Sequence, residues 1–193
     1  MNSTTDSSAR RRLPPDARRD EILASATELI SSVGFNATTI DHFARAAGIS
    51  RPGLLHHFSS KEALLEAVLA RRDRDTVDAL RHDTIAHTPG AARKLLDDLV
   101  RWNADRPQLV QLYTILAAEA LSIDHPAYHY FRARERLALE FFAERIVPWH
   151  PRPRAAALQL IAYLDGLQLH WLRDSAIDMV EQWEFFAESF FED

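Results

Sequence analysis

The chain contains no cysteine among its 193 residues. This absence excludes disulfide bonds, thiolate metal sites and a cysteine nucleophile. Long hydrophobic runs are absent as well, since no uncharged apolar stretch approaches the ~18 residues that span a membrane. The polar start MNSTTDSSARRRLPP also lacks the apolar segment of a secretion signal. We therefore expect a soluble, cytoplasmic protein that does not enter a membrane.

An excess of positive charge is also lacking, because the formal net charge is −5. That value excludes a uniformly basic nucleic-acid binder. The charge is unevenly distributed, however: residues 1–61 carry a balance of +2 and the remaining residues a balance of −7. Because an acidic body repels phosphate, any contact with nucleic acid belongs to the N-terminal third of the chain.

Glycine is scarce, with 5 residues, and most of these glycines and of the 9 prolines lie at or near the ends of helical patterns, with Gly166 inside one as an exception. Apolar residues recur at helical spacing between these breaks, and no segment shows sustained strand alternation. The first apolar stripe comprises Ile22, Leu23, Ala26, Leu29, Ile30 and Val33. The pattern predicts an all-α fold of about nine helices, near residues 16–33, 39–47, 51–57, 60–80, 89–102, from 107, 124–147, 153–172 and 175–191.

A break separates two short helical patterns in the stretch FARAAGISRPGLLHHF. Gly48 supplies the positive φ that a sharp turn needs, and Ile49 is expected to be buried between the two helices. Ser50 is expected to cap the second helix, with Pro52 tolerated in its first turn. This arrangement predicts a helix-turn-helix, in which Gly53 lets the backbone approach DNA closely. A tight helical hairpin without nucleic acid is the alternative reading of the same residues.

The stretch RRDEILASATELISSVGFNATTIDHFARAAGISRPGLLHHFSSKEALLEAVLARR, residues 18–72, resembles the TetR family of one-component transcriptional regulators. The resemblance is carried by the helix end at Gly34, the pair Thr38 and Thr39, the turn up to Ser50, and HHFSSKEALL. It implies a homodimer whose N-terminal helices bind operator DNA and whose C-terminal helices bind an inducer and the partner subunit. The domains expected are a flexible arm (residues 1–15), a three-helix DNA-binding domain (16–62), and a ligand-binding and dimerisation bundle (63–193).

The resemblance implies that the second helix of the turn faces the major groove and that phosphates are held beside it. Arginine suits base reading because its guanidinium donates two hydrogen bonds to guanine O6 and N7. Lysine, histidine and helix N-termini suit phosphate. The predicted DNA-binding residues are Thr39, Ser50, Arg51, Pro52, Gly53, His56, His57 and Lys61.

Two residues depart from the family pattern. Leu55 stands where the family usually has a tyrosine whose hydroxyl points to phosphate, and Asp41 stands where a basic residue is frequent. These departures leave open a second interpretation, a helical interaction module that does not bind DNA. The run Arg10, Arg11 and Arg12 either reaches the minor groove or stays disordered.

The last two helical patterns are apolar over more than one stripe, which requires more than one packing neighbour. We expect part of this surface in the core of the chain and part in a four-helix dimer interface. The predicted dimerisation residues are Leu164, Leu167, Gln168, Trp171, Val180, Trp183 and Phe186. The predicted ligand-binding residues, aromatic for the most part, are Trp102, Tyr113, Leu116, Tyr128, Phe131 and Tyr163.

The function that we expect is that of a homodimeric repressor, released from a roughly palindromic operator by a small molecule of unknown identity. We expect no enzyme activity, no cofactor and no metal, because no HExxH motif or glycine-rich phosphate loop is present. A metal-dependent sensor or enzyme is the alternative that Asp124, His125 and His129 leave open, since two histidines four residues apart share one helix face.

Overall fold

The structure, a computed structural model, describes residues 14–80 and 85–191. This part of the chain contains nine α-helices, one π-helix and no strand, which confirms the all-α prediction. The arginines of the predicted arm lie outside the described residues. The helices are α1 (Pro15–Val33), α2 (Ile40–Ala46), α3 (Arg51–His57), α4 (Lys61–Leu80), α5 (Pro89–Ala104), α6 (Pro107–Glu119), α7 (Tyr128–Phe141), the π-helix η1 (Phe142–Ile146), α8 (Pro153–Arg173) and α9 (Met179–Phe191).

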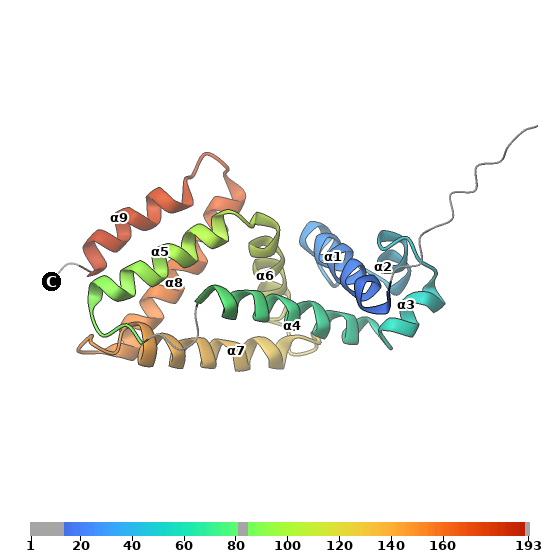
Figure 1. Ribbon diagram of the computed structural model, residues 1–193, viewed down its shortest axis with the longest axis horizontal. Helices are drawn as coiled ribbons and strands as arrows, with labels where there is room; N and C mark the ends of the chain where they lie inside the picture. The colour runs from blue at the N-terminus through green and yellow to red at the C-terminus, as the bar shows by residue number, and fades with distance from the viewer. Residues whose placement is uncertain (1–13, 81–84, 192–193) are drawn as a thin grey trace, which may run out of the picture.

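The helices form an elongated molecule with two ends (Figure 1). Helices α1, α2 and α3 gather at one end, and α5, α8 and α9 form the other. Helices α4 and α7 run along the molecule between these ends, and α6 lies beside α1 in the middle. The predicted sequence of a short three-helix module followed by a helical body is therefore visible in the arrangement of the helices.

The core of the N-terminal module includes residues from the body. Helix α1 buries Ile22 and Ile30 against Phe43 of α2 and Leu54 of α3 in one cluster. Val33 was expected in the same stripe but is 53% exposed, because α1 ends there at its last turn. Helix α6 completes the cluster with Leu112 and Leu116, and the segment after the helix adds Ala120 and Ala127.

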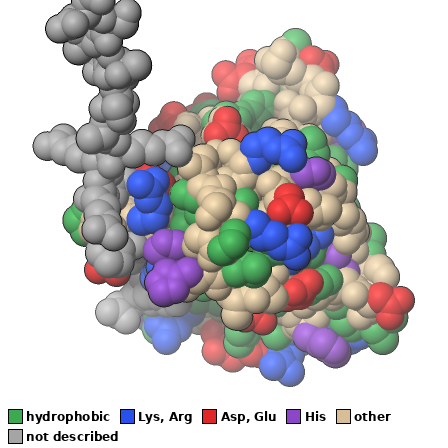
Figure 2. All heavy atoms as spheres, turned by 90° about the vertical axis from the view of Figure 1, so that its right-hand side faces the viewer, with side chains coloured by type: hydrophobic (Ala, Val, Ile, Leu, Met, Phe, Trp, Pro, Cys, Tyr) green, Lys and Arg blue, Asp and Glu red, His purple; other side chains and the backbone are tan. Residues whose placement is uncertain are grey.

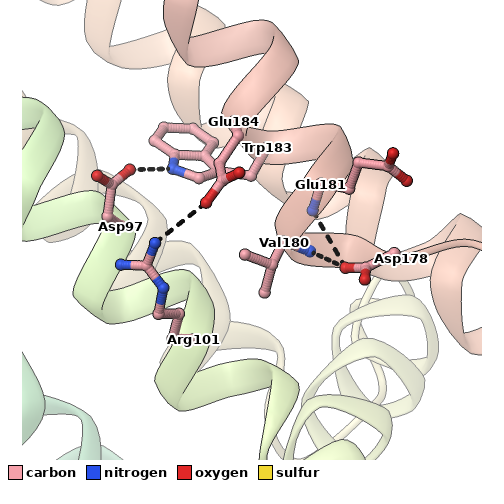
Figure 3. A network of polar contacts seen from close by, with 7 residues as sticks. All are labelled: Asp97, Arg101, Asp178, Val180, Glu181, Trp183 and Glu184. Carbon is pink, nitrogen blue, oxygen red and sulfur yellow. Dashed lines mark hydrogen bonds and ion pairs between the residues drawn. The ribbon is translucent and has the colours of Figure 1, made fainter.

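A second core holds α5, α8 and α9 together. Its centre is Trp183, which is fully buried and donates its indole N–H to Asp97 Oδ1 at 2.7 Å (Figure 3). One turn away, Arg101 Nη2 lies 3.1 Å from Glu184 Oε1. Asp178 caps α9, because its Oδ1 accepts the N–H groups of residues 180 and 181 at 2.9 and 3.1 Å. These contacts fix α9 along α5.

The region around α7 differs from the sequence prediction at both ends. The helix begins at Tyr128 rather than near residue 124, because the N–H of Tyr128 is bonded to the carbonyl of His125 in a turn. Its C-terminal end changes to a π-helix, which the sequence pattern does not indicate. There the carbonyls of Arg145 and Ile146 accept the N–H of Ala86 at 2.7 Å and the indole N–H of Trp149 at 3.2 Å.

Truncation of α6 where it enters the N-terminal core should destabilise the protein. Leu116 has no exposed surface and packs in the cluster built on α1. We expect Leu116→Ala to lower the free energy of unfolding by about 2–5 kcal/mol, measured by urea titration. Leu121→Ala, at a side chain that is 83% exposed, is the matched control and should change it by no more than about 0.5 kcal/mol. Equal effects of the two substitutions would contradict the shared core.

Candidate nucleic-acid interface

The turn between α2 and α3 is closed by a glycine in the left-handed region. Gly48 has a φ of 64°, a conformation that side chains with a Cβ rarely adopt. The N–H of Gly48 bonds to the carbonyl of Arg45 at 3.0 Å, and that of Ile49 to the carbonyl of Ala44 at 2.9 Å. This pair of bonds is the Schellman pattern that ends a helix, and it lets α3 leave at a new angle. The residues singled out from the sequence do form the predicted turn.

Helix α3 presents its first turn to solvent. Ser50 caps the helix, since its hydroxyl oxygen accepts the N–H of Gly53 at 3.2 Å. Arg51 and Pro52 are exposed, whereas Leu54 on the opposite face is buried in the core. The N-terminal residues of this helix are therefore available to a partner, and its apolar face is not.

Arg51 does not stand alone on this surface. Its Nη1 lies 3.1 Å from Oδ2 of Asp41 on α2, and both side chains are more than half exposed. An exposed ion pair of this kind contributes about 0–1 kcal/mol to stability. The pair therefore orients the Arg51 guanidinium, but little free energy is needed to separate it from Asp41. Asp41, which stands where the family often has a basic residue, therefore pairs with Arg51, the residue predicted to read a base.

The C-terminal end of α3 carries two histidines and is tied to α1 by an arginine that sequence reasoning missed. Arg19 Nη1 donates to the carbonyl of His57 at 2.9 Å, and its guanidinium lies 4.2 Å from the ring centroid of Phe58. Burial lowers the pKa of His57, and the positive charges of His56 and Arg19 lower it further. These effects favour the neutral imidazole of His57, while His56 is exposed.

The remaining two predicted residues lie at helix starts. Thr39 is exposed and caps α2, accepting the N–H of His42 at 3.3 Å. Lys61 begins α4 and is half-buried, with its Nζ 3.9 Å from the centroid of the Phe35 ring. Burial lowers the pKa of Lys61, and the carboxylates of Glu62 and Glu119 partly oppose that shift. The phosphate contact predicted for Lys61 stays a prediction.

The end of the molecule that carries α2 and α3 is shown in Figure 2. Basic and histidine side chains are spread over this face, with single acidic side chains between them. The face is therefore mixed in charge rather than uniformly positive, as the small positive balance of the N-terminal third predicted.

The six predicted ligand-binding residues lie in several different surroundings. Tyr113 and Phe131 contact each other, with ring centroids 5.2 Å apart, and the Arg72 guanidinium lies 4.1 Å from the Tyr113 ring. Burial raises the pKa of Tyr113 to about 12. Leu116, by contrast, is a core residue of the N-terminal cluster.

The other three aromatic residues of that set have separate local partners. Trp102 lies under the Arg106 guanidinium at 4.5 Å, and the Tyr128 hydroxyl accepts a hydrogen bond from a neighbouring arginine on α7. Tyr163 stacks on Phe186 with ring centroids 3.7 Å apart. Of the six, only Tyr163 lines the groove of about 600 Å³ between α8 and α9.

The predicted dimerisation residues divide between core and surface. Leu164, Leu167 and Trp183 are buried in the core of their own chain, so that Trp183 has no surface to offer a partner. Gln168, Trp171, Val180 and Phe186 are half-buried. Two other apolar side chains of these helices are exposed, Leu158 on α8 and Phe185 on α9.

The alternative of a metal site is not supported. His125 is buried and its Nδ1 accepts the N–H of Ala127 at 3.1 Å, so that this atom is occupied. His129 is exposed in the first turn of α7. Within residues 14–80 and 85–191, no three histidine, aspartate or glutamate side chains are placed to hold a metal ion.

These features define a helix-turn-helix DNA-binding protein with a larger helical body. The model of the family described as bacterial regulatory proteins, tetR family, matches residues 22–68. The HTH-type transcriptional regulator BetI of Escherichia coli is 30% identical over 163 residues, covering 81% of each chain. The chain therefore belongs to the TetR family and is a transcriptional regulator.

Two further comparisons describe the module and the fold. The HTH-type transcriptional activator FasR of Mycolicibacterium smegmatis is 43% identical over 70 residues, which is 36% of this chain and 32% of that protein. The crystal structure of NalD, the secondary repressor of the MexAB-OprM multidrug efflux pump in Pseudomonas aeruginosa, has a TM-score of 0.68 and 23% identity, and covers 92% of this chain and 96% of its own.

In the described part of the chain, no helix is both long and apolar enough to span a membrane.

The cap of α3 gives a stability prediction for the interface. Ser50→Ala removes the acceptor of the Gly53 N–H and should destabilise the protein by about 1 kcal/mol, measured by thermal unfolding. Ser59→Ala changes an exposed serine between α3 and α4 and serves as the control. If both variants unfold at the wild-type temperature, the hydroxyl does not act as a cap in solution.

Proposed function

We propose that this regulator is a homodimeric repressor that binds a roughly palindromic operator through α3 and releases it when a small molecule binds the body. The observation that carries the proposal is the exposed first turn of α3, which holds Arg51 above a buried Leu54. A helix oriented in this way can enter the major groove with its N-terminal residues toward the base edges.

Repression is the direction of regulation that we propose. NalD, named as a repressor, matches 92% of this chain in its fold. The similarity to the activator FasR covers 36% of the chain, so that it concerns the DNA-binding end rather than the body. The direction of regulation depends on where the operator lies relative to the promoter, and the test is transcription of a reporter gene with and without the protein.

The chemistry of Arg51 supports base reading despite its ion pair with Asp41. Arginine has five N–H donors in a planar fork. Asp41 engages Nη1, at 3.1 Å, which leaves donors on Nη2 and Nε for guanine O6 and N7. Asp41 then orients the guanidinium, while its negative charge weakens attraction to phosphate at every DNA sequence.

The dimer is proposed to form through α8 and α9. The groove between these helices has a mixed lining: small and apolar residues, among them Gly166 and Leu167, stand beside the polar side chains of His170, Asp178, Glu181 and Gln182. Phe185 is 77% exposed on α9, and burial of such a side chain against a second copy is favourable. A two-fold axis at this surface would place two α3 helices at one fixed spacing, as a palindromic operator requires.

The ligand is proposed to act on the helices that join the two ends of the molecule. Tyr113 on α6 and Phe131 on α7 stay candidate ligand contacts because they lie together beside Arg72 of α4. A ligand that binds here can change DNA affinity only if it favours one of two arrangements of these helices.

Selection of bound DNA from a random pool tests the proposed function directly. We expect enriched sequences with two inverted half-sites whose centres are separated by about 10 base pairs or a multiple. Binding should weaken steeply with added salt, because contacts to phosphate release counterions. Failure to enrich any sequence would exclude operator binding by the isolated protein.

Arg51→Ala should relax the sequence preference at one position of each half-site. We expect a loss of about 1–3 kcal/mol in binding the selected operator and a smaller loss on DNA mutated at the base that Arg51 reads. Arg45→Ala, which removes an equal charge from the last turn of α2, is the control and should affect both DNAs alike. Fluorescence anisotropy titrations of the four combinations give the comparison, and equal losses for Arg51→Ala on both DNAs would contradict base reading.

Gly166 provides a test of the dimer surface. A Cβ at this position meets nothing within 4 Å in one chain, and the residue lines the groove. Gly166→Arg should therefore be tolerated by the single chain but should block the partner, giving a monomer with weakened operator binding. Gly166→Ala should stay dimeric and gain up to about 1 kcal/mol in helix stability. Light scattering during size-exclusion chromatography measures both, and a dimeric Gly166→Arg variant would place the interface elsewhere.

A further inference from the structure

A carboxylate from the body holds the backbone of the turn between α1 and α2. Glu119 is the last residue of α6. Its Oε2 accepts the N–H of Phe35 at 2.9 Å, and its Oε1 accepts the N–H of Asn36 at 3.1 Å. A single carboxylate thus bridges two successive amides, a charge-assisted arrangement that is stronger and more directional than two neutral hydrogen bonds.

The turn is shaped to receive this carboxylate. Gly34 ends α1 with a φ of 81°, and a Cβ built there would lie 2.5 Å from Glu119 Oε1. Glycine is therefore required twice, once for the left-handed backbone and once for the space that the carboxylate occupies. The family motif at Gly34 and Phe35 consequently has a partner 84 residues further along the chain.

The contact is enclosed by groups from two other segments, the loop before α7 and the start of α4. The Glu119 side chain is 19% exposed, and the buried Nε2 of His125 lies 3.7 Å from its Oε2. The His125 ring meets the Phe35 ring edge-on at 5.5 Å, and Lys61 of α4 covers that ring. Burial lowers the pKa of His125, and the Glu119 charge partly opposes this shift. The carboxylate is thus the centre of a junction between α1, α4, α6 and the loop before α7.

The position of this junction connects the body to the DNA-reading helix. The turn continues through Thr38, whose hydroxyl donates to the Phe35 carbonyl at 2.6 Å, and α2 starts at Ile40. Helix α2 packs on α3, and α6 packs on α5 and α8 of the body. Any displacement of Glu119 relative to the turn is therefore a displacement of the reading helix relative to the body.

We propose that Glu119 is a positioning residue for DNA recognition, which sets the separation of the two α3 helices in the dimer. This inference rests on the proposed homodimeric operator binding. Without the bridge, the apolar core that α6 shares with α1, α2 and α3 stays in place, and each module keeps its own contacts with a half-site. The modules lose a directional link to the body, so that the dimer accepts a wider range of half-site spacings.

The experiment uses the full-length protein and the operator selected from the random pool. Operators are prepared with base pairs inserted or deleted between the half-sites, together with a single half-site duplex. Wild type is expected to prefer one spacing sharply. Glu119→Gln, which puts an NH₂ group against one backbone N–H, should weaken binding at the preferred spacing by about tenfold. Affinity for the half-site should stay within about twofold, and the preference among spacings should flatten.

Two further variants keep the test decisive. Glu119→Asp retains the charge but shortens the side chain, so that it cannot bridge both amides, and it should flatten the spacing profile as the glutamine does. Glu140→Gln, an equal change in the last turn of α7, is the control and should keep the wild-type profile. Circular dichroism confirms that each variant is folded, and a loss of stability alone would lower binding to the half-site as well.

The outcomes separate this inference from the proposed function. If wild type selects no paired half-sites, the proposed homodimeric operator binding fails, and the inference fails with it. If wild type shows a sharp optimum and both Glu119 variants show the same optimum and breadth, only the positioning role is overturned. A flattened profile in both variants with unchanged half-site affinity supports the role.

Discussion

The apolar face of α6, a helix that also packs on α5 and α8, lies in the core of the DNA-binding end, and this packing constrains the rest of the structure. Leu112 and Leu116 are buried against the residues of α1 that also support α2 and α3. Burial of such side chains is the largest favourable contribution to folding in a protein of this size. The DNA-binding end therefore has no complete core of its own, and its position is defined by a helix of the body.

The local features of the interface were predictable because they depend on neighbours in the sequence. Gly48, Ser50 and Pro52 act over three or four residues, and the turn, the cap and the start of α3 lie where these residue types require. The apolar spacing also located the buried face, since Leu54 and Phe58 are in the core. Periodicity carried the prediction of an all-α fold for the same reason.

Contacts between distant segments could not be predicted in this way. The pairing of Arg51 with Asp41 crosses from α3 to α2, and Glu119 meets a turn more than 80 residues earlier in the chain. Spacing within a helix identifies which residues are apolar but not which helix they pack against. Leu116 was therefore predicted to contact a ligand but lies in the N-terminal core. Trp183 was predicted to contact the partner subunit but is fully buried in its own chain.

The hydrogen bonds from Phe35 and Asn36 to Glu119 have a consequence for hybrid regulators built by recombination of related genes. A crossover placed directly after α3 would join a turn from one parent to an α6 from the other. The amides of that turn would then face whatever side chain the second parent carries at the end of α6. Hybrids that inherit both segments from one parent keep the carboxylate acceptor together with its two amide donors, so that the end of α6 and the turn after α1 should be exchanged as one piece.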